Sequence, residues 1–149
     1  AVLSIDDGTH RVELLRPPRP LSLLVIDDDP IIIESLTEVL RRDGHQVVSA
    51  NSGAAGIDTF TNARREGNVF DAVITDLGMP YVDGRAVAAA IKAASPATPV
   101  LLLTGWGQRL LADNDVPPHV DRILNKPPKL EELRRVLAAL VVSAKSTTS

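Results

Sequence analysis

Cysteine and long apolar runs are missing from this sequence of 149 residues, and each absence excludes a class of protein. Without cysteine, the chain can form neither a disulfide framework nor a thiolate metal site. No apolar run approaches the roughly 20 residues that a helix needs to cross a bilayer. We therefore expect a cytoplasmic chain that makes no membrane contact of its own.

An excess of basic charge is also absent. The chain has 16 Lys and Arg against 19 Asp and Glu, which gives a net charge of -3 and a pI near 5.6. Because a surface that binds nucleic acid usually needs clustered Lys and Arg side chains, we expect no direct contact with nucleic acid. The residues that are present, 44% hydrophobic and 23% charged, are ordinary for a globular domain.

Composition divides the chain into three parts. Residues 1–20 end in a proline-rich run and are predicted to be an N-terminal extension and linker. Residues 21–143 are long enough for one domain with its own core. The last helix is expected to close near Val142, which leaves residues 144–149 as a polar tail.

Apolar segments alternate with amphipathic segments along the predicted domain. Five strand candidates begin near Leu21, Gln46, Val69, Pro99 and Val120, at the spacing of strand-helix-strand crossover units. Apolar side chains recur at helical spacing in four segments: Ile32, Leu36, Val39 and Leu40; Ile57 and Phe60; Val87, Ile91 and Ala94; Leu130, Leu133, Leu137 and Leu140. The segment 108–115 supports only a short helix, so we expect this fourth unit to be the most mobile.

These units predict an α/β fold with a doubly wound, five-stranded parallel sheet. Right-handed crossovers place helices on both faces of such a sheet. The first, third and fourth strands are the most apolar and should be central, whereas residues 46–50 are more polar, as in an edge strand. The predicted strand order is 2-1-3-4-5, and its winding reverses between the first and third strands.

Acidic residues stand where two of the central strands end. Asp27, Asp28 and Asp29 follow the first strand, and Asp76 follows the third. Asp29 precedes Pro30 and an apolar helix, which is the pattern of a helix N-cap. Turn-forming residues follow Asp76, so we expect a loop to present its carboxylate. Asp27, Asp28 and Asp76 should therefore meet at the reversal, where open α/β sheets bind ligands.

Three carboxylates in one crevice repel one another, and a hard divalent cation offsets that repulsion. Mg²⁺ or Mn²⁺ is the predicted occupant. Thr104 and Lys126, which follow the fourth and fifth strands, add a hydroxyl and an ammonium that suit a phosphoryl group. Taken singly, Thr104 could bond a neighbouring carbonyl and Lys126 could form a structural ion pair with Asp27. Taken together, the four strand ends favour phosphoryl transfer.

From about Pro20 to Val142 the chain resembles the receiver domain of two-component response regulators, which has a flavodoxin-like fold. The resemblance rests on the acidic pair Asp27 and Asp28, on Asp76 before a Gly-Met-Pro turn, on Thr104 and on Lys126 before a proline. It implies that Asp76 accepts a phosphoryl group from a histidine kinase or a histidine phosphotransfer domain.

The resemblance also implies roles for the other residues of the site. Asp27, Asp28 and Asp76 would bind Mg²⁺ together with the backbone carbonyl of Gly78. Thr104 would be the hydroxyl that turns toward the phosphoryl group, and Lys126 would form an ion pair with it. The Lys126–Pro127 peptide bond would be cis.

One departure from the family concerns signalling, because Ile123 stands where the family usually has an aromatic switch residue. Phosphorylation should then be transmitted through Thr104 and the loop from Gly105 to Pro118. The resemblance implies no enzyme beyond self-catalysed phosphoryl transfer and autodephosphorylation. Output would come from a partner or domain outside this chain, which is either a stand-alone regulator or the receiver of a hybrid histidine kinase.

The first methionine is Met79, so we expect a chain that is processed or cut from a longer polypeptide. Two alternative functions stay open. A degenerate receiver would act only as a docking or dimerisation module, although the complete set of site residues speaks against it. A haloacid-dehalogenase-like phosphatase would use Asp27, Asp29, Thr104 and Lys126, but this scheme gives Asp76 no role.

Overall fold

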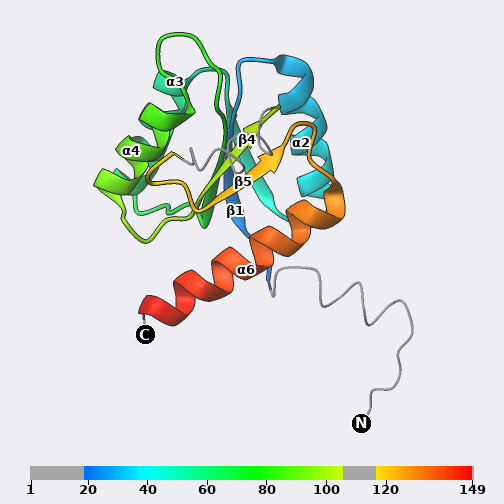
Figure 1. Ribbon diagram of the computed structural model, residues 1–149. Helices are drawn as coiled ribbons and strands as arrows, with labels where there is room; N and C mark the ends of the chain where they lie inside the picture. The colour runs from blue at the N-terminus through cyan, green and yellow to red at the C-terminus, as the bar shows by residue number, and fades with distance from the viewer. Residues whose placement is uncertain (1–18, 106–116, 149) are drawn as a thin grey trace, which may run out of the picture.

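One parallel sheet of five strands forms the centre of the protein (Figure 1). The computed structural model describes residues 19–105 and 117–148, with side chains as far as Leu140. The strands are β1 (Ser22–Ile26), β2 (Gln46–Ala50), β3 (Ala72–Asp76), β4 (Val100–Thr104) and β5 (Arg122–Asn125). Their order is β2-β1-β3-β4-β5 and every neighbouring pair is parallel, which confirms the predicted fold and strand order.

Helices cover both faces of the sheet (Figure 1). They are α2 (Pro30–Arg42) and α6 (Leu130–Thr148) on one face, and α3 (Gly53–Arg65) and α4 (Gly84–Ala94) on the other. Alternation along β1 explains the two layers, because Leu23 and Val25 point to the first face while Leu24 and Ile26 point to the second. Apolar side chains of both faces are almost completely buried, as expected for a central parallel strand.

Three helices begin at side chains that cap their first turn. Asp29 accepts a hydrogen bond from Ile31 N, Ser52 from Ala55 N, and Asp83 from Ala86 N. Each such cap stabilises a helix by about 1 kcal/mol. The predicted N-cap at Asp29, with proline in the first turn, is confirmed.

Two details of the helices differ from expectation. Ala94 is exposed, because it is the last residue of α4 and lies beyond the buried stripe. Helix α6 continues past Val142 to Thr148, since the residues after Val142 include neither glycine nor proline to end it. The short helix expected at 108–115 lies outside the described residues. The division into 1–20, 21–143 and 144–149 stays a prediction.

A group of polar contacts anchors the chain where it enters β1. Arg19 forms an ion pair with Asp71, at 2.8 Å between Nη2 and Oδ1, and Asp71 Oδ2 also accepts from Ser22 N at 2.8 Å. His45 is buried and its Nδ1 accepts from Leu21 N at 2.9 Å. These contacts lie at the amino-terminal ends of the strands, and the acidic residues lie at the carboxyl ends. Among the described helices, none is long and apolar enough to cross a membrane.

Candidate functional site

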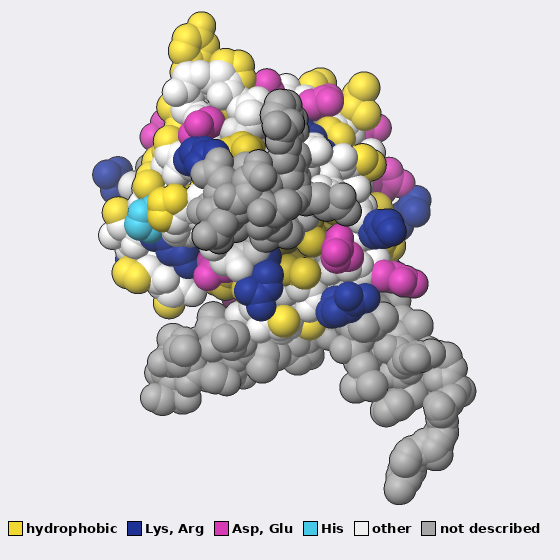
Figure 2. Space-filling model, in the orientation of Figure 1, with side chains coloured by type: hydrophobic (Ala, Val, Ile, Leu, Met, Phe, Trp, Pro, Cys, Tyr) yellow, Lys and Arg dark blue, Asp and Glu magenta, His cyan; other side chains and the backbone are white. Residues whose placement is uncertain are grey.

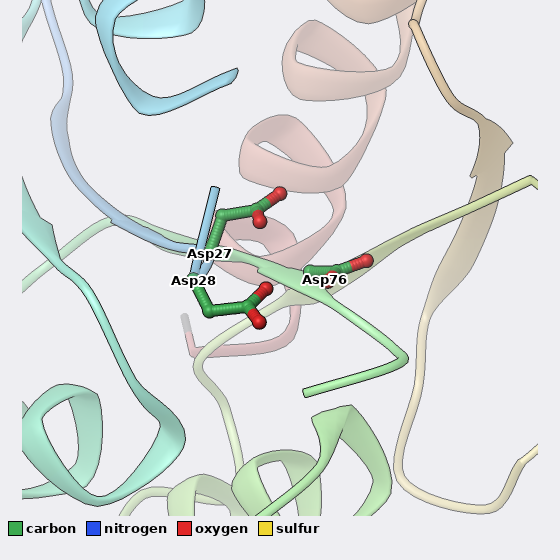
Figure 3. Close-up of side chains that lie close together, drawn as sticks. All are labelled: Asp27, Asp28 and Asp76. Atoms are coloured by element: carbon green, nitrogen blue, oxygen red, sulfur yellow. The ribbon is translucent and has the colours of Figure 1, made fainter. Parts of the chain in front are cut away.

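The predicted acids meet at the carboxyl ends of β1 and β3 (Figure 3). Asp27 follows β1 directly and its N–H donates to Ala50 O at 3.1 Å, so the β1–β2 ladder extends to it. Asp76 is the last residue of β3. Carboxylate oxygens of Asp27, Asp28 and Asp76 lie within 4.8 Å of one another, which confirms that the three acids converge.

Burial separates the three carboxylates. Asp27 is 1% exposed and Asp76 is 6% exposed, whereas Asp28 is exposed to solvent. The expectation that a loop presents Asp76 is therefore wrong, because β3 extends one residue further than its apolar run and carries the acid with it. The site is a partly buried crevice with Asp28 at its mouth.

Lys126 offsets part of this negative charge. Its Nζ lies 2.9 Å from Asp27 Oδ2 and 3.1 Å from Asp76 Oδ1. Burial alone would lower the pKa of Lys126, but hydrogen bonds and attraction from both carboxylates overcome this effect and raise it. Lys126 is therefore more than a structural partner of Asp27, because it joins β1 to β3.

Burial raises the pKa of Asp27, although a backbone hydrogen bond from Asp29 N at 2.9 Å and the contact with Lys126 favour the charged form. The Asp76 charge acts in the same direction as burial. Three carboxylates and one ammonium leave a formal charge of -2, from -3 and +1. An arrangement of oxygen ligands with this residual charge fits a hard divalent cation such as Mg²⁺.

Asp29 does not belong to this cluster. Its carboxylate accepts from Ile31 N at 2.9 Å and caps α2. The phosphatase scheme uses Asp29, and the hydrogen bond by which Asp29 caps α2 speaks against that scheme.

The remaining predicted residues lie around the crevice. Thr104 is the last residue of β4, is 4% exposed and pairs in register with Asn125. Lys126 N donates to Thr104 O at 3.1 Å, and the Lys126–Pro127 peptide is cis as predicted. Gly78 lies exposed in the loop after β3. Which of these groups contacts a phosphoryl group or a metal stays a prediction.

The loop between β3 and α4 is held close to the site. Gly84 N donates to Leu77 O at 2.9 Å, and a Cβ at Gly84 would overlap Asp76 O and lie 2.9 Å from Leu77 Cα. Tyr81, in the same loop, is fully exposed and has a positive φ of 67°. Its conformation is one that only Gly, Asn and Asp adopt readily.

Sequence reasoning missed the glycines that allow helices to approach the site. Gly84 is one of the turn-forming residues after Asp76, and Gly53 and Gly56 precede Ile57 and Phe60 in a segment with only two apolar positions at helical spacing. Their spacing was a usable signal, because glycine costs about 1 kcal/mol relative to alanine in a helix and needs a compensating reason. Gly53 and Gly56 are three residues apart and therefore share one helix face.

Charges of both signs are interspersed on the visible face of the described part (Figure 2). Lys and Arg side chains are mixed there with Asp and Glu, and the described residues visible in this view form no continuous basic field. Together, fold and site define a doubly wound α/β protein with an acidic crevice at the reversal of its strand order.

Comparison with known proteins identifies the family. Residues 23–138 match the Response regulator receiver domain, and the chain belongs to this family. Response regulator MprA of Mycobacterium sp. (strain KMS) is 33% identical over 122 residues, which are 82% of this chain and 51% of MprA. The transcriptional regulatory protein GlrR of Escherichia coli (strain K12) is 37% identical over 89 residues, or 60% of this chain and 19% of GlrR.

Solved structures agree with this assignment. A response regulator receiver domain protein from Clostridium thermocellum superposes with a TM-score of 0.73 at 29% identity, covering 87% of this chain and 99% of that one. The receiver domain of sensor histidine kinase PA1611 from Pseudomonas aeruginosa PAO1 shares the fold, with a TM-score of 0.72 at 23% sequence identity. The superposition covers 83% of this chain and 99% of that one. That protein is described with a magnesium ion coordinated in its active site cleft.

The chain is thus a receiver domain of the kind found in two-component regulators, which take phosphate from histidine kinases. Receiver domains are signalling modules and generally not enzymes. The chain spans about half or less of the length of the curated relatives MprA and GlrR.

Proposed function

We propose that Asp76 accepts a phosphoryl group from the phosphohistidine of a histidine kinase or a histidine phosphotransfer domain. The observation that carries the proposal is the position of Asp76, a buried carboxylate at the end of a central strand, beside two further acids and Lys126. An oxygen of Asp76 attacks phosphorus, so that a P–O bond forms as the P–N bond to the donor imidazole breaks. The electron pair of that bond stays with the imidazole nitrogen, and the product is an aspartyl phosphate.

The residues around Asp76 prepare this transfer. Asp27, Asp28, Asp76 and the carbonyl of Gly78 would hold Mg²⁺, or Mn²⁺ with the same oxygen ligands. When bound, the ion would neutralise charge that develops on the transferred phosphoryl oxygens. Lys126 already contacts Asp76 Oδ1 and would move its ion pair to a phosphoryl oxygen, and the Thr104 hydroxyl would donate to another.

Hydrolysis by water returns the carboxylate and releases inorganic phosphate, so the chain catalyses at most its own phosphorylation and dephosphorylation. With Ile123 half-buried on β5, the Thr104 hydroxyl and the loop after it are the proposed route by which the phosphoryl group changes the surface. The loop residues 106–116 lie outside the described part. We further propose a cytoplasmic location, a downstream protein partner and no direct contact with nucleic acid.

Phosphorylation by a small donor tests the proposal without a cognate kinase. Purified protein is incubated with acetyl phosphate and Mg²⁺, and the adduct is measured by intact mass spectrometry and mapped by peptide analysis. Wild type should gain one phosphoryl group on Asp76, and Asp76→Asn should gain none. Asp58→Asn, which removes an exposed acid of α3, is the matched control and should behave as wild type.

Other outcomes would redirect the assignment. Label that survives in Asp76→Asn but is lost in Asp27→Asn would favour the phosphatase reading. A folded wild-type protein that gains no phosphoryl group from acetyl phosphate, and none from a panel of histidine kinases, would indicate a docking module.

A further inference from the structure

Two glycines in the first turns of α3 face the two segments that carry the acidic site. Gly53 is the first residue of the helix, Gly56 lies three residues later, and both are buried. Because glycine destabilises a helix relative to alanine, a pair of glycines on one face needs a structural reason. That reason is a close approach at each position.

Gly53 packs against the loop that leads from Asp76 to α4. A Cβ at Gly53 would overlap the backbone oxygen of Val82 and would lie 2.8 Å from both Val82 Cβ and Val82 Cγ1. The obstacle includes backbone, so a side chain at this position would displace either the helix or the loop.

The loop transmits such a displacement because it is tightly hydrogen-bonded. Val82 N donates to Pro80 O at 2.7 Å, and Met79 N donates to Leu77 O at 3.1 Å. Gly78, whose carbonyl is the proposed metal ligand, is the central residue of the turn from Leu77 to Met79, and the turn from Pro80 to Val82 follows it directly. A shift of Val82 therefore moves the backbone that carries Gly78.

Gly56 packs against the other segment. A Cβ there would overlap Ile26 Cδ1 and lie 2.7 Å from Ile26 Cγ1, and Ile26 directly precedes Asp27. The obstacle is side chain and not backbone, and its Cδ1 atom can move by rotation about χ2, so an added methyl group is accommodated more easily at Gly56 than at Gly53.

We propose that Gly53 is a positioning residue for the metal site, and that the first turns of α3 set the spacing between the acids after β1 and the Gly78 loop. The proposal rests on the proposed function, because the spacing matters through Mg²⁺ binding. Positioning groups behind metal ligands commonly contribute 10-fold to 100-fold in affinity, and we expect about a 10-fold loss in Gly53→Ala.

Mg²⁺ affinity, measured by isothermal titration calorimetry on the folded chain, tests this proposal together with the melting temperature. Gly53→Ala should weaken Mg²⁺ binding about 10-fold, and Gly56→Ala should weaken it less. Val82→Ala removes the Cγ atoms on the loop side of the same contact and should also weaken Mg²⁺ binding, which keeps the test valid if Gly53→Ala does not fold.

Two control variants separate positioning from loss of stability. Ala54→Gly weakens the same helical turn at an exposed position, and Phe60→Leu weakens the packing of α3 about two turns beyond Gly53, where Phe60 stacks on Phe70. Both should lower the melting temperature while Mg²⁺ affinity stays within about twofold of wild type, because neither alters the contact with Val82.

Phosphorylation by acetyl phosphate supplies a second readout. Gly53→Ala should be slow at low Mg²⁺ and should approach the wild-type rate at saturating Mg²⁺, since its defect is in metal affinity. Unchanged Mg²⁺ affinity in folded Gly53→Ala and Val82→Ala, or an equal loss in the two controls, would overturn the positioning role. A wild-type protein that does not bind Mg²⁺ would overturn the metal site itself, which is a different result.

Discussion

Replacing Asp28 by asparagine separates the contribution of the acidic cluster from that of the fold. Asp28 is the exposed member of the cluster, and its carboxylate oxygen lies within 4.8 Å of those of Asp27 and Asp76. At that distance each pair of charges repels by about 0.9 kcal/mol in a water-like dielectric and about 3.5 kcal/mol at an effective dielectric of 20. Asp28 faces solvent, so the lower value applies to each of its two pairs, and Asp28→Asn should stabilise the metal-free protein by up to about 1.7 kcal/mol, less the lost attraction to Lys126.

In the presence of Mg²⁺, wild type should instead be more stable than Asp28→Asn. An ion that binds only the folded state stabilises it by about 2.7 kcal/mol at 100 times its dissociation constant. For a domain of this size we expect the melting temperature of wild type to rise by roughly 8 °C. Asp28→Asn lacks one of the proposed ligands and should show little or no increase.

Asp29→Asn is the matched control, because it removes the same charge one residue away. Asparagine also caps helices, so α2 should keep its N-cap in this variant. Differential scanning fluorimetry across a Mg²⁺ titration, with NaCl at equal ionic strength, measures all three proteins. A full Mg²⁺ response in Asp28→Asn, or a lost response in Asp29→Asn, would refute Asp28 as a ligand.

Two further predictions concern stability. Tyr81→Gly should raise the free energy of unfolding by about 0.5–1 kcal/mol. Its left-handed conformation costs a non-glycine residue about 1–2 kcal/mol, and the greater conformational entropy that glycine loses on folding offsets part of this gain. The exposed Tyr81 ring contributes little packing, and a lower melting temperature in the variant would contradict this reasoning. Burial lowers the pKa of His45, although Asp43 and Asp71 act in the opposite direction. The stability linked to His45 should therefore be complete above pH 6.5, the pKa in the unfolded chain, and should fall as the pH drops from there toward the lower pKa of the folded protein. The loss is about 1.4 kcal/mol for each pH unit by which the folded pKa lies below the unfolded pKa. Urea unfolding between pH 7.5 and 5 should show this slope in wild type and in the exposed control His119→Gln, and a slope that persists in His45→Gln would assign it elsewhere.

Local patterns in the sequence were sufficient to predict the architecture. The positions of the apolar strands, the edge character of residues 46–50 and the rule for right-handed crossovers predicted the strand order that the structure has. The N-cap at Asp29 was predictable because a cap and its helix are neighbours in the chain. The convergence of Asp27, Asp28 and Asp76 also followed, since parallel strands end at one edge of their sheet.

Burial and close contact were decided only by the tertiary structure. The sequence could not indicate that Asp76 belongs to β3, because the residue at which a strand ends depends on its pairing with neighbouring strands. Nor could it indicate that Lys126 contacts Asp27 and Asp76 together, because that contact depends on how the ends of three strands are arranged. Nor could it indicate that Gly53 meets Val82, because the approach of a helix to a loop depends on how both pack against the sheet. Periodicity along the chain specifies which face of an element is apolar, whereas distances between elements follow from packing of the whole core.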